Sequence, residues 1–488
     1  MILLCVAVLI LLQSPLAPFA NKTSEYDGGV FIYGARELLR GARIYEDFFD
    51  HKGPLLYLLN ALGLWLAGGR LVGIWWMEVV TLWVAALFSY KAARLLSGRF
   101  VALCSAVYAL SLLSVLQPGQ GAQHYALPFL GISLFLFVRG LARADARDEF
   151  FRTRELVCIS VCFALVLLLQ PNLAAPWAGF GLSTAVVLLV RGRYAYVARA
   201  AAVVVPTVLA TLAPFVAYAL HTGVLEDAVA CYWKFNRVNP PVSVFSLAKG
   251  TYYALVNVHR GSAVIPFSLY GLYVAHLTAR GESRALHAGL ASALAVTLVL
   301  GCGLSGRDYP HYAIILVPLL CVTTAFVLEH LRQRGKMGRW ALVCILASFC
   351  WYQAVQQAYW TYVAYRPDEE LMRLVSLIKY HSAPTDKIAV VGNDSQLYYL
   401  SERQGSSRYH YTYPVADVKG FGIDVWQQYR EDLVRNEPRL IIWKTKDYPR
   451  LPAALEDLVA SRYAALEDRT GSAVLFKRRE RSREGTPS

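Results

Sequence analysis

Three short polar segments, separated by long apolar stretches, carry the side chains that could do chemistry in this chain of 488 residues. The first lies within residues 21–70 and contains Asp27 and the pair His51-Lys52; the others are 119–125 (GQGAQHY) and 307–312 (RDYPHY). A carboxylate can take a proton from a hydroxyl, and lysine, arginine and histidine can offset the charge of a phosphate. If the three segments meet in one cavity, they would offer cations for a phosphate and a carboxylate base.

The residues after Asp27 also allow a purely structural role for its carboxylate. Apolar residues at 31, 35, 38 and 39 follow the helical period, and Gly41 can end the helix. The pattern predicts an amphipathic helix on the outer membrane surface, with Asp27 at its start. Because a carboxylate is favoured at the positive end of a helix dipole, a capping role stays open beside a catalytic one.

These segments are positioned by a chain that is 56% hydrophobic and only 17% charged, whereas soluble domains have roughly 25% charged residues. Its apolar runs suit transmembrane helices, which need roughly 17–25 residues. The first run lacks the basic start of a signal peptide and is predicted to remain as a helix. The run Leu55–Ala67 is too short to cross and is predicted to lie in the interface. About eleven transmembrane helices are predicted, at 1–20, 71–90, 100–117, 125–138, 157–170, 173–190, 200–220, 262–279, 286–303, 312–328 and 340–357.

The net charge of +14 first suggests a nucleic-acid partner, but its distribution argues against one. Lysine and arginine gather in alternate loops between the apolar runs, as the positive-inside rule requires of cytoplasmic loops. The N-terminus is therefore predicted to be cytoplasmic in a multi-pass cell-membrane protein. The predicted extracytoplasmic parts are 21–70, 118–124, 221–261, 304–311 and everything after residue 357.

From about residue 380 the composition becomes that of a small soluble domain. Lys387–Val391, Arg439–Trp443 and Ala473–Phe476 are typical of short buried strands, and Asp424–Arg435 and Ala453–Ser461 have helical spacing. Alternating strands and helices predict a small C-terminal extracytoplasmic α/β domain behind a polytopic α-helical membrane domain. The predicted division is 1–357 for the transmembrane domain, 358–379 for a connection, 380–480 for the α/β domain and 481–488 for a basic, polar tail.

The first polar segment resembles the first extracytoplasmic loop of the GT-C superfamily of glycosyltransferases. The resemblance rests on Asp27, on Gly41-x-x-Ile44-Tyr45-x-Asp47 and on His51-Lys52-Gly53-Pro54-Leu55-Leu56-Tyr57. Arg307-x-Tyr309-Pro310-His311-Tyr312, and a tail with Gly392-Asn393-Asp394 and Ser407-Arg408-Tyr409, are similar to bacterial members with an RgtA/B/C/D-like domain. Members of the superfamily use polyprenyl-phosphate sugars; they include the protein O-mannosyltransferases and the aminoarabinose transferase of lipid A.

The resemblance implies roles for individual residues. Asp27 takes the place of the catalytic base, and Lys52 that of the lysine in a Lys-Pro-Pro-like motif near the donor phosphate, with Gly53 in place of the first proline. Where relatives often have a glutamate in the second outer loop, this chain has Gln123-His124. The residues predicted to bind substrate are Lys52, His51, Arg307, His311, Tyr312, Gln123, His124, Glu25 and Asp47.

The reaction so implied is the inverting transfer of a sugar from a polyprenyl-phosphate donor to a hydroxyl of an envelope glycan, lipid or protein, on the outer face of the membrane. No cofactor is predicted, because side-chain cations suffice for a single phosphate, although a divalent ion at Asp27 and Asp308 stays open. The alternatives are a transporter or flippase of lipid-linked glycans, and a non-catalytic envelope-assembly subunit. A transporter would be expected to carry internal repeats and charges deep within its helices, of which Glu78 is the one clear case.

Overall fold

The computed structural model describes residues 14, 16–17, 26–114, 121–147, 150–239, 243–260, 264–279, 285–333, 335–336, 340, 351, 355, 358–359 and 368–480. The chain forms two compact units, each drawn from several stretches of sequence. The membrane unit comprises Met1–Asn21, Lys52–Tyr218 and Pro240–Tyr365. The tail unit comprises Lys22–His51, Ala219–Asn239 and Arg366–Ser488.

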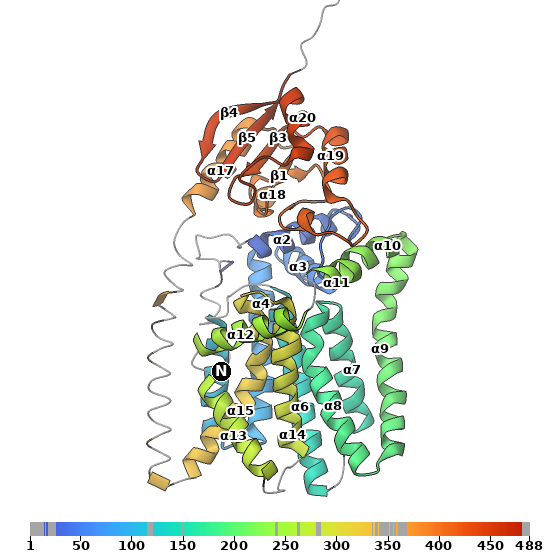
Figure 1. Cartoon of the computed structure of the whole chain (residues 1–488), viewed down its shortest axis with the longest axis vertical. Coiled ribbons are helices and arrows are strands. Elements are labelled where there is room, and N and C mark those ends of the chain that lie inside the picture. Colours follow the sequence, from blue (N-terminus) through green and yellow to red (C-terminus); the bar gives the residue numbers. More distant parts are fainter. Residues whose placement is uncertain are drawn as a thin grey trace, which may run out of the picture. The chain divides into compact units, whose positions relative to one another are not determined.

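The membrane unit is a bundle of helices (Figure 1). Six described stretches are long and apolar enough to cross a membrane: Val72–Arg94, Ala122–Arg147, Pro171–Val190, Tyr194–Thr222, Ala285–Ser305 and Pro310–Gln333. The helices are α3 (Pro54–Leu66), α4 (Val72–Arg94), α5 (Arg99–Ser111), α6 (Ala122–Arg147), α7 (Thr153–Leu167), α8 (Ala175–Val190), α9 (Tyr194–Thr222), α12 (Val244–Arg260), α13 (Val264–Ala279), α14 (Ala285–Val296) and α15 (Val317–Gln333). Short 3₁₀ turns η2 (Pro171–Ala174) and η6 (Pro310–Leu316) and the π-helical η4 (Thr297–Cys302) extend three of them. The protein is therefore a polytopic helical membrane protein.

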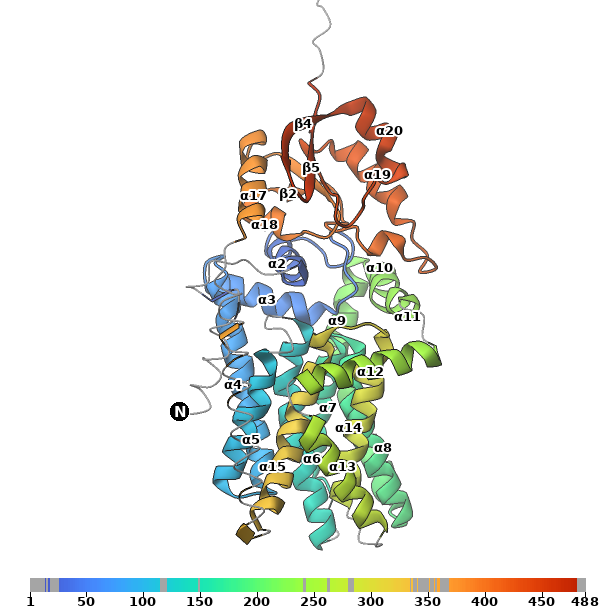
Figure 2. The same ribbon diagram turned by 60° about the vertical axis from the view of Figure 1, so that its left-hand side comes forward.

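The described helices lie at the predicted apolar runs. The predicted spans 1–20 and 340–357 lie largely outside the described residues, and α5, α7 and α13, at three other predicted spans, are not among the six stretches long enough to cross, so the total of eleven stays a prediction. The run predicted to lie in the interface forms α3, which has 13 residues where a crossing needs roughly 20. Helices α3 and α12 run across one end of the bundle rather than along it (Figure 2).

Small residues allow the long helices of the membrane unit to pack closely. A Cβ atom added to Gly179 of α8 would come within 2.5 Å of the Cα atom of Ala293 in α14. Such small-residue contacts let helix backbones approach where lipid removes the hydrophobic drive to associate. Glu78 of α4 is 1% exposed, so its side chain is enclosed by the bundle and does not face lipid.

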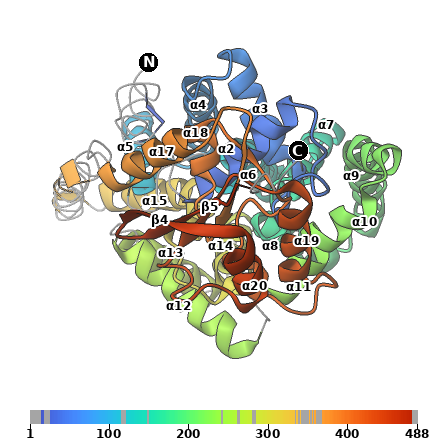
Figure 3. The ribbon, with the colours of Figure 1, turned by 90° about the horizontal axis from the view of Figure 1, so that it is seen from above.

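The tail unit contains a five-stranded sheet in the order β2-β1-β3-β5-β4. Strands β1 (Lys387–Val391), β2 (Gln404–Gly405) and β3 (Leu440–Lys444) are parallel, whereas β4 (Tyr463–Thr470) and β5 (Ala473–Arg478) run antiparallel. Helices α17 (Glu369–His381) and α18 (Gln396–Ser401) lie on one face, and α19 (Val425–Asn436) and α20 (Ala453–Arg462) on the other (Figures 2 and 3). Both faces of β1 are covered, and Ile388, Val390 and Val391 are fully buried.

The five elements expected in this part of the chain occur within two residues of their predicted ends. The sequence did not reveal β2, β4, α17 or α18. Strand β2 has only two residues, and β4 (YAALEDRT) lacks the run of β-branched residues by which a strand is recognised.

The helix expected after Asp27 is α2 (Tyr26–Leu39), and Gly41 follows it with a φ of +90°. Within the tail unit α2 packs on α18 through Gly29, Tyr33 and Arg36, and its position on the membrane surface stays a prediction. Arg36 of α2 donates hydrogen bonds to the carbonyl oxygens of Tyr398 (3.2 Å) and Arg403 (3.0 Å), at the C-terminal end of α18. A guanidinium at this negative end of a helix dipole is stabilising.

The segment 219–239 belongs to the tail unit as well. It holds α10 (Leu225–Ala228), the π-helical η3 (Val229–Lys234) and α11 (Phe235–Val238). The guanidinium of Arg408 pairs with Asp227 at 2.8 Å and donates to the carbonyl oxygen of Tyr45, so three distant parts of the sequence meet at one side chain.

Candidate functional site

Lys52 of the membrane unit is held by a close backbone contact. The amide nitrogen of Gly53 donates to the carbonyl oxygen of Leu169 at 2.9 Å, and that of Leu55 to Leu168 at 3.1 Å. A Cβ atom at position 53 would stand 2.1 Å from the Leu168 carbonyl oxygen, so only glycine fits there. The contact places the Lys52 ammonium 3.1 Å from Oε1 of Gln170, and the Lys52 side chain is 7% exposed.

His124 and His311 lie near Lys52 in the same unit. His311 interacts electrostatically with both Lys52 and His124. Both ring nitrogens of His124 are buried, and neither has a hydrogen-bond partner among the described residues. Leaving a buried polar group without a partner costs roughly 1–3 kcal/mol, which makes His124 a candidate for contact with a ligand. We call Lys52, His124, Gln170 and His311 the lysine–imidazole cluster.

In the third polar segment, neighbouring aromatic rings pack against His311 of this cluster. The ring of Tyr309 stacks on His311 at 5.4 Å with an interplanar angle of 14°, and Tyr312 meets His311 edge-on at 4.7 Å. The Arg307 guanidinium donates to the Tyr309 hydroxyl at 3.2 Å. Asp308 accepts a hydrogen bond from the side chain of Asn257 at 2.9 Å. The segment thus holds Arg307, His311 and Tyr312 together and gives Asp308 a structural partner, while their contact with substrate stays a prediction.

Carboxylates gather in the tail unit. Oδ1 of the buried Asp50 accepts a hydrogen bond from the Tyr411 hydroxyl at 3.0 Å and lies 3.0 Å from Nδ1 of His51. The Asn236 amide donates to the His51 carbonyl oxygen at 2.7 Å. Burial, and then the charges of Asp50 and Asp27, raise the pKa of Tyr411 well above its usual value, so Asp27 lies within electrostatic range of this phenol. We call Asp27, Asp50, His51 and Tyr411 the carboxylate cluster.

The remaining predicted residues have simpler surroundings. Asp27 is exposed in the first turn of α2, and Gln123 is buried beside His124. Asp47 accepts a hydrogen bond from the backbone nitrogen of Arg43 at 2.6 Å and so closes a turn of the first loop. Glu25 lies outside the described residues.

Sequence reasoning missed Asp50, Gln170 and Tyr411. Asp50 directly precedes His51-Lys52, and that run of three ionisable residues before Gly53-Pro54 was a usable signal. Gln170 and Tyr411 stand in no motif, and only the fold brings them to Lys52 and Asp50.

The tail unit also contains a cavity of about 560 Å³. Its lining carries both signs of charge, with Glu46, Asp47 and Asp432 facing Lys387, Arg408 and Arg435. Among the described residues, no three His, Cys, Asp or Glu side chains are placed to hold a metal ion together.

Comparisons with known proteins give a matching family and a shared fold. Residues 1–330 match the family model for the competence-induced protein Ccs4 N-terminal domain. No curated protein matches the chain. The crystal structure of ArnT from Cupriavidus metallidurans in the apo state has a TM-score of 0.64 at 14% identity, with 97% of each chain covered. The structure of the same protein bound to undecaprenyl phosphate has a TM-score of 0.63 at 14% identity, again with 97% of each chain covered. The chain therefore shares the fold of ArnT.

Proposed function

The chain belongs to the family of the competence-induced protein Ccs4 N-terminal domain, and we propose that it is a glycosyltransferase that uses a polyprenyl-phosphate sugar. The family description names no reaction, so the proposal rests on the fold and on the candidate site. The ArnT fold is that of an enzyme whose structure holds undecaprenyl phosphate, which supports a lipid-linked donor.

The observation that carries the proposal is the lysine–imidazole cluster. The buried Lys52 ammonium lies within electrostatic range of His311, and His311 within range of His124, whose ring nitrogens have no hydrogen-bond partner among the described residues; such a group suits one phosphate, which accepts several hydrogen bonds. In the proposed reaction, Lys52 and His311 offset the charge that grows on the leaving phosphate, with Arg307 as a further cation. Fixed donors in a site with little water are the arrangement that stabilises such charge most strongly.

Asp27 is the proposed base. The acceptor hydroxyl gives its proton to Asp27 while its oxygen attacks the anomeric carbon from the side opposite the phosphate, and the bond to the phosphate oxygen breaks. The sugar is transferred with inversion, and polyprenyl phosphate leaves. General-base catalysis is worth about 10²–10⁴-fold in rate. The acceptor is the hydroxyl of an envelope glycan, lipid or protein on the outer face, as the distribution of basic loops suggests.

The test combines loss of the gene with one variant. Mass spectrometry of envelope glycans, glycolipids and glycoproteins from a deletion strain should lack one sugar modification. The wild-type gene should restore it, and Asp27→Asn should not. Asp457→Asn, which alters another exposed helical carboxylate of the tail unit, is the matched control and should restore it fully. Full restoration by Asp27→Asn would overturn the role of Asp27 as base.

A transporter or flippase of lipid-linked glycans is the second candidate. The observations in its favour are the buried Glu78 and the π-helical turn η4, because transporters carry interrupted helices and charges at depth. The two functions separate in a purified system: a transferase releases polyprenyl phosphate from its donor, whereas a flippase leaves the donor intact. A non-catalytic assembly subunit would release none either, and would leave the donor on its own side of the membrane.

A further inference from the structure

A second cavity of about 620 Å³ opens in the membrane unit, at the end of the bundle where basic loops predominate. It lies between the segment leading into α7 and the start of α9. Four of its eight lining residues are arginines, and none is acidic: Phe150, Phe151, Arg152, Thr153, Arg154, Arg193, Tyr196 and Arg199. We refer to it as the basic cavity. We propose that the basic cavity binds the phosphate headgroup of an anionic phospholipid from the surrounding bilayer.

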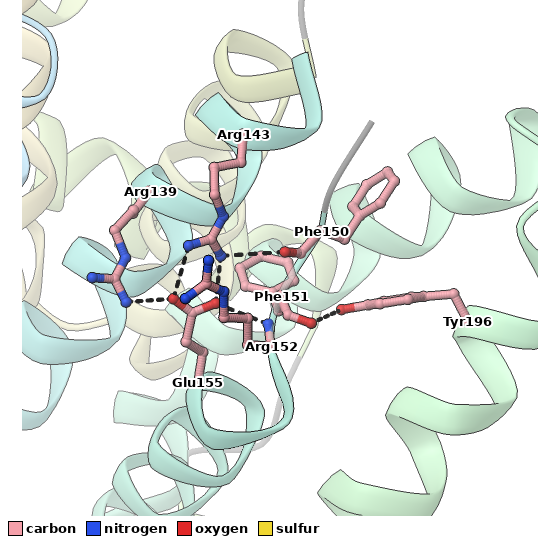
Figure 4. Close-up of polar contacts among 7 residues, drawn as sticks. All are labelled: Arg139, Arg143, Phe150, Phe151, Arg152, Glu155 and Tyr196. Carbon is pink, nitrogen blue, oxygen red and sulfur yellow. Dashed lines mark hydrogen bonds and ion pairs between the residues drawn. The ribbon is translucent and has the colours of Figure 1, made fainter. Parts of the chain in front are cut away.

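The nearest described carboxylates are already neutralised by other arginines. Glu155, one turn into α7, pairs with Arg139 and Arg143 of α6, and Figure 4 shows both guanidinium groups turned toward it. Asp145 pairs with Arg191 at 3.4 Å and accepts hydrogen bonds from two backbone nitrogens at the start of α14. Asp148 and Glu149 precede the cavity in sequence and lie outside the described residues. Among the described residues, no carboxylate lines the cavity beside Arg152, Arg154 and Arg199.

Two helix N-termini add to the positive electrostatic potential of the cavity. Helix α7 begins at Thr153 and α9 at Tyr194, and residues from the first turns of both line the cavity. The first backbone N–H groups of a helix point out of its N-terminus, and the helix dipole favours an anion there. Arg152, Arg154 and Arg199 are exposed, so their guanidinium groups can reach a ligand.

The cavity is also fixed in shape. The Tyr196 hydroxyl of α9 donates to the Phe151 carbonyl oxygen at 2.7 Å, as Figure 4 shows, and its ring lies 5.5 Å from that of Phe150. The guanidinium of Arg199 donates to the Thr153 hydroxyl at 2.7 Å. These contacts join the start of α9 to the start of α7.

Helix α9 explains why the ligand is a lipid and not a soluble anion. It has 29 residues, and none of its most apolar window is buried within the structure, so its sides are open to acyl chains. Val190 is 82% exposed and Tyr194 66% exposed where the cavity meets the helix start. Tyrosine at such a position is typical of the boundary between headgroups and acyl chains. A lipid with its phosphate in the cavity would lay its chains along α9. Basic pockets between membrane helices bind anionic headgroups in this way.

The experiment uses the full-length protein in detergent, with lipids added back and bound lipid counted by native mass spectrometry. Phosphatidylglycerol should bind about tenfold or more tightly than phosphatidylcholine with the same chains. The variant carrying Arg152→Gln, Arg154→Gln, Arg193→Gln and Arg199→Gln should lose that preference. The matched control carries Lys91→Gln and Arg99→Gln, two exposed cations of α4 and α5 outside the cavity, and should keep it.

Several outcomes would overturn the proposal. Equal binding of the two lipids by the wild-type protein would do so, and this comparison needs no variant to fold. Unchanged preference in the four-arginine variant, or equal loss in the control, would place the anion elsewhere. Displacement of the lipid by millimolar glycerol 1-phosphate as effectively as by phosphatidylglycerol would show that a soluble anion is the ligand. If the four-arginine variant does not fold, Arg154→Gln alone should still weaken the preference.

Discussion

The two clusters of the candidate site differ in charge, in burial and in the unit that holds them. The lysine–imidazole cluster belongs to the membrane unit and combines cationic and neutral groups that suit a phosphate. The carboxylate cluster belongs to the tail unit and contains the proposed base, Asp27, within electrostatic range of Tyr411, which donates to the buried Asp50. The boundary between the units falls between His51 and Lys52, which are consecutive in the chain. This separation implies that donor binding and proton abstraction can be removed independently.

The largest expected effect comes from the lysine–imidazole cluster. Lys52→Met removes the ammonium that contacts Gln170, and we expect about 10–100-fold weaker binding of undecaprenyl phosphate, because charge-assisted hydrogen bonds are worth about 1.5–3 kcal/mol. Titration of the purified protein with the lipid, followed by native mass spectrometry, measures this. Asp27→Asn should bind the lipid as the wild type does. If Asp27→Asn weakens binding as much as Lys52→Met, the two clusters do not have separate roles.

The next effect tests how Lys52 is positioned. Gly53→Ala places a methyl group where 2.1 Å separates it from the Leu168 carbonyl oxygen, so the backbone must move. We expect a loss of about 1–3 kcal/mol in stability, as for other overpacked sites, and weaker lipid binding because Lys52 moves from Gln170. Thermal unfolding and lipid titration measure the two losses. Gly181→Ala in α8, where a Cβ atom meets nothing within 4 Å, should cause neither.

A smaller effect is expected in the carboxylate cluster. Tyr411→Phe removes the hydroxyl that donates to Asp50 at 3.0 Å and leaves a buried carboxylate with one donor fewer. We expect the unfolding free energy to fall by about 1–2 kcal/mol, with lipid binding unchanged. Chemical denaturation measures the first and lipid titration the second, and Tyr380→Phe, at a tyrosine that is 82% exposed, is the control. A drop in lipid binding without a drop in stability would contradict the separation of the clusters.

The comparison of the clusters also shows what the sequence could reveal. Lys52, His124 and His311 were found because each stands in a short polar segment at the end of an apolar run, where composition alone marks it. The contact between Asp50 and Tyr411 joins residues 361 positions apart, and no local pattern records such a contact. The same holds for the fold. The apolar run of β1 was recognisable, but the packing of α2 on α18 depends on Arg36 reaching carbonyl groups far along the chain.

The last expected effect is a pH dependence that belongs to the tail unit. Burial lowers the pKa of His410 to about 4, although the charge of Asp50 and a hydrogen bond to the backbone of Phe49 oppose the shift. His410 lies against Ser395, whose hydroxyl is 2.8 Å from Nδ1, and its ring centroid is 4.4 Å from that of Tyr33, with the rings tilted by 31°. At pH 5, His410 is therefore neutral in the folded protein. In the unfolded chain, where a histidine has a pKa of about 6.5, it binds a proton at that pH.

The free energy of unfolding is therefore higher at pH 7 and falls as the pH drops below about 6.5. We expect it to be about 1–2 kcal/mol lower at pH 5 than at pH 7. Denaturation midpoints of the full-length protein at pH 7 and pH 5 measure the loss. His410→Gln removes the titrating group and can still meet Ser395, so its midpoint should depend less on pH, whereas His221→Gln, at an exposed histidine, should behave as the wild type. The His410→Gln variant should bind undecaprenyl phosphate at pH 7 as the wild type does, because the lysine–imidazole cluster belongs to the membrane unit. A variant that keeps the full pH dependence would show that His410 is not its source.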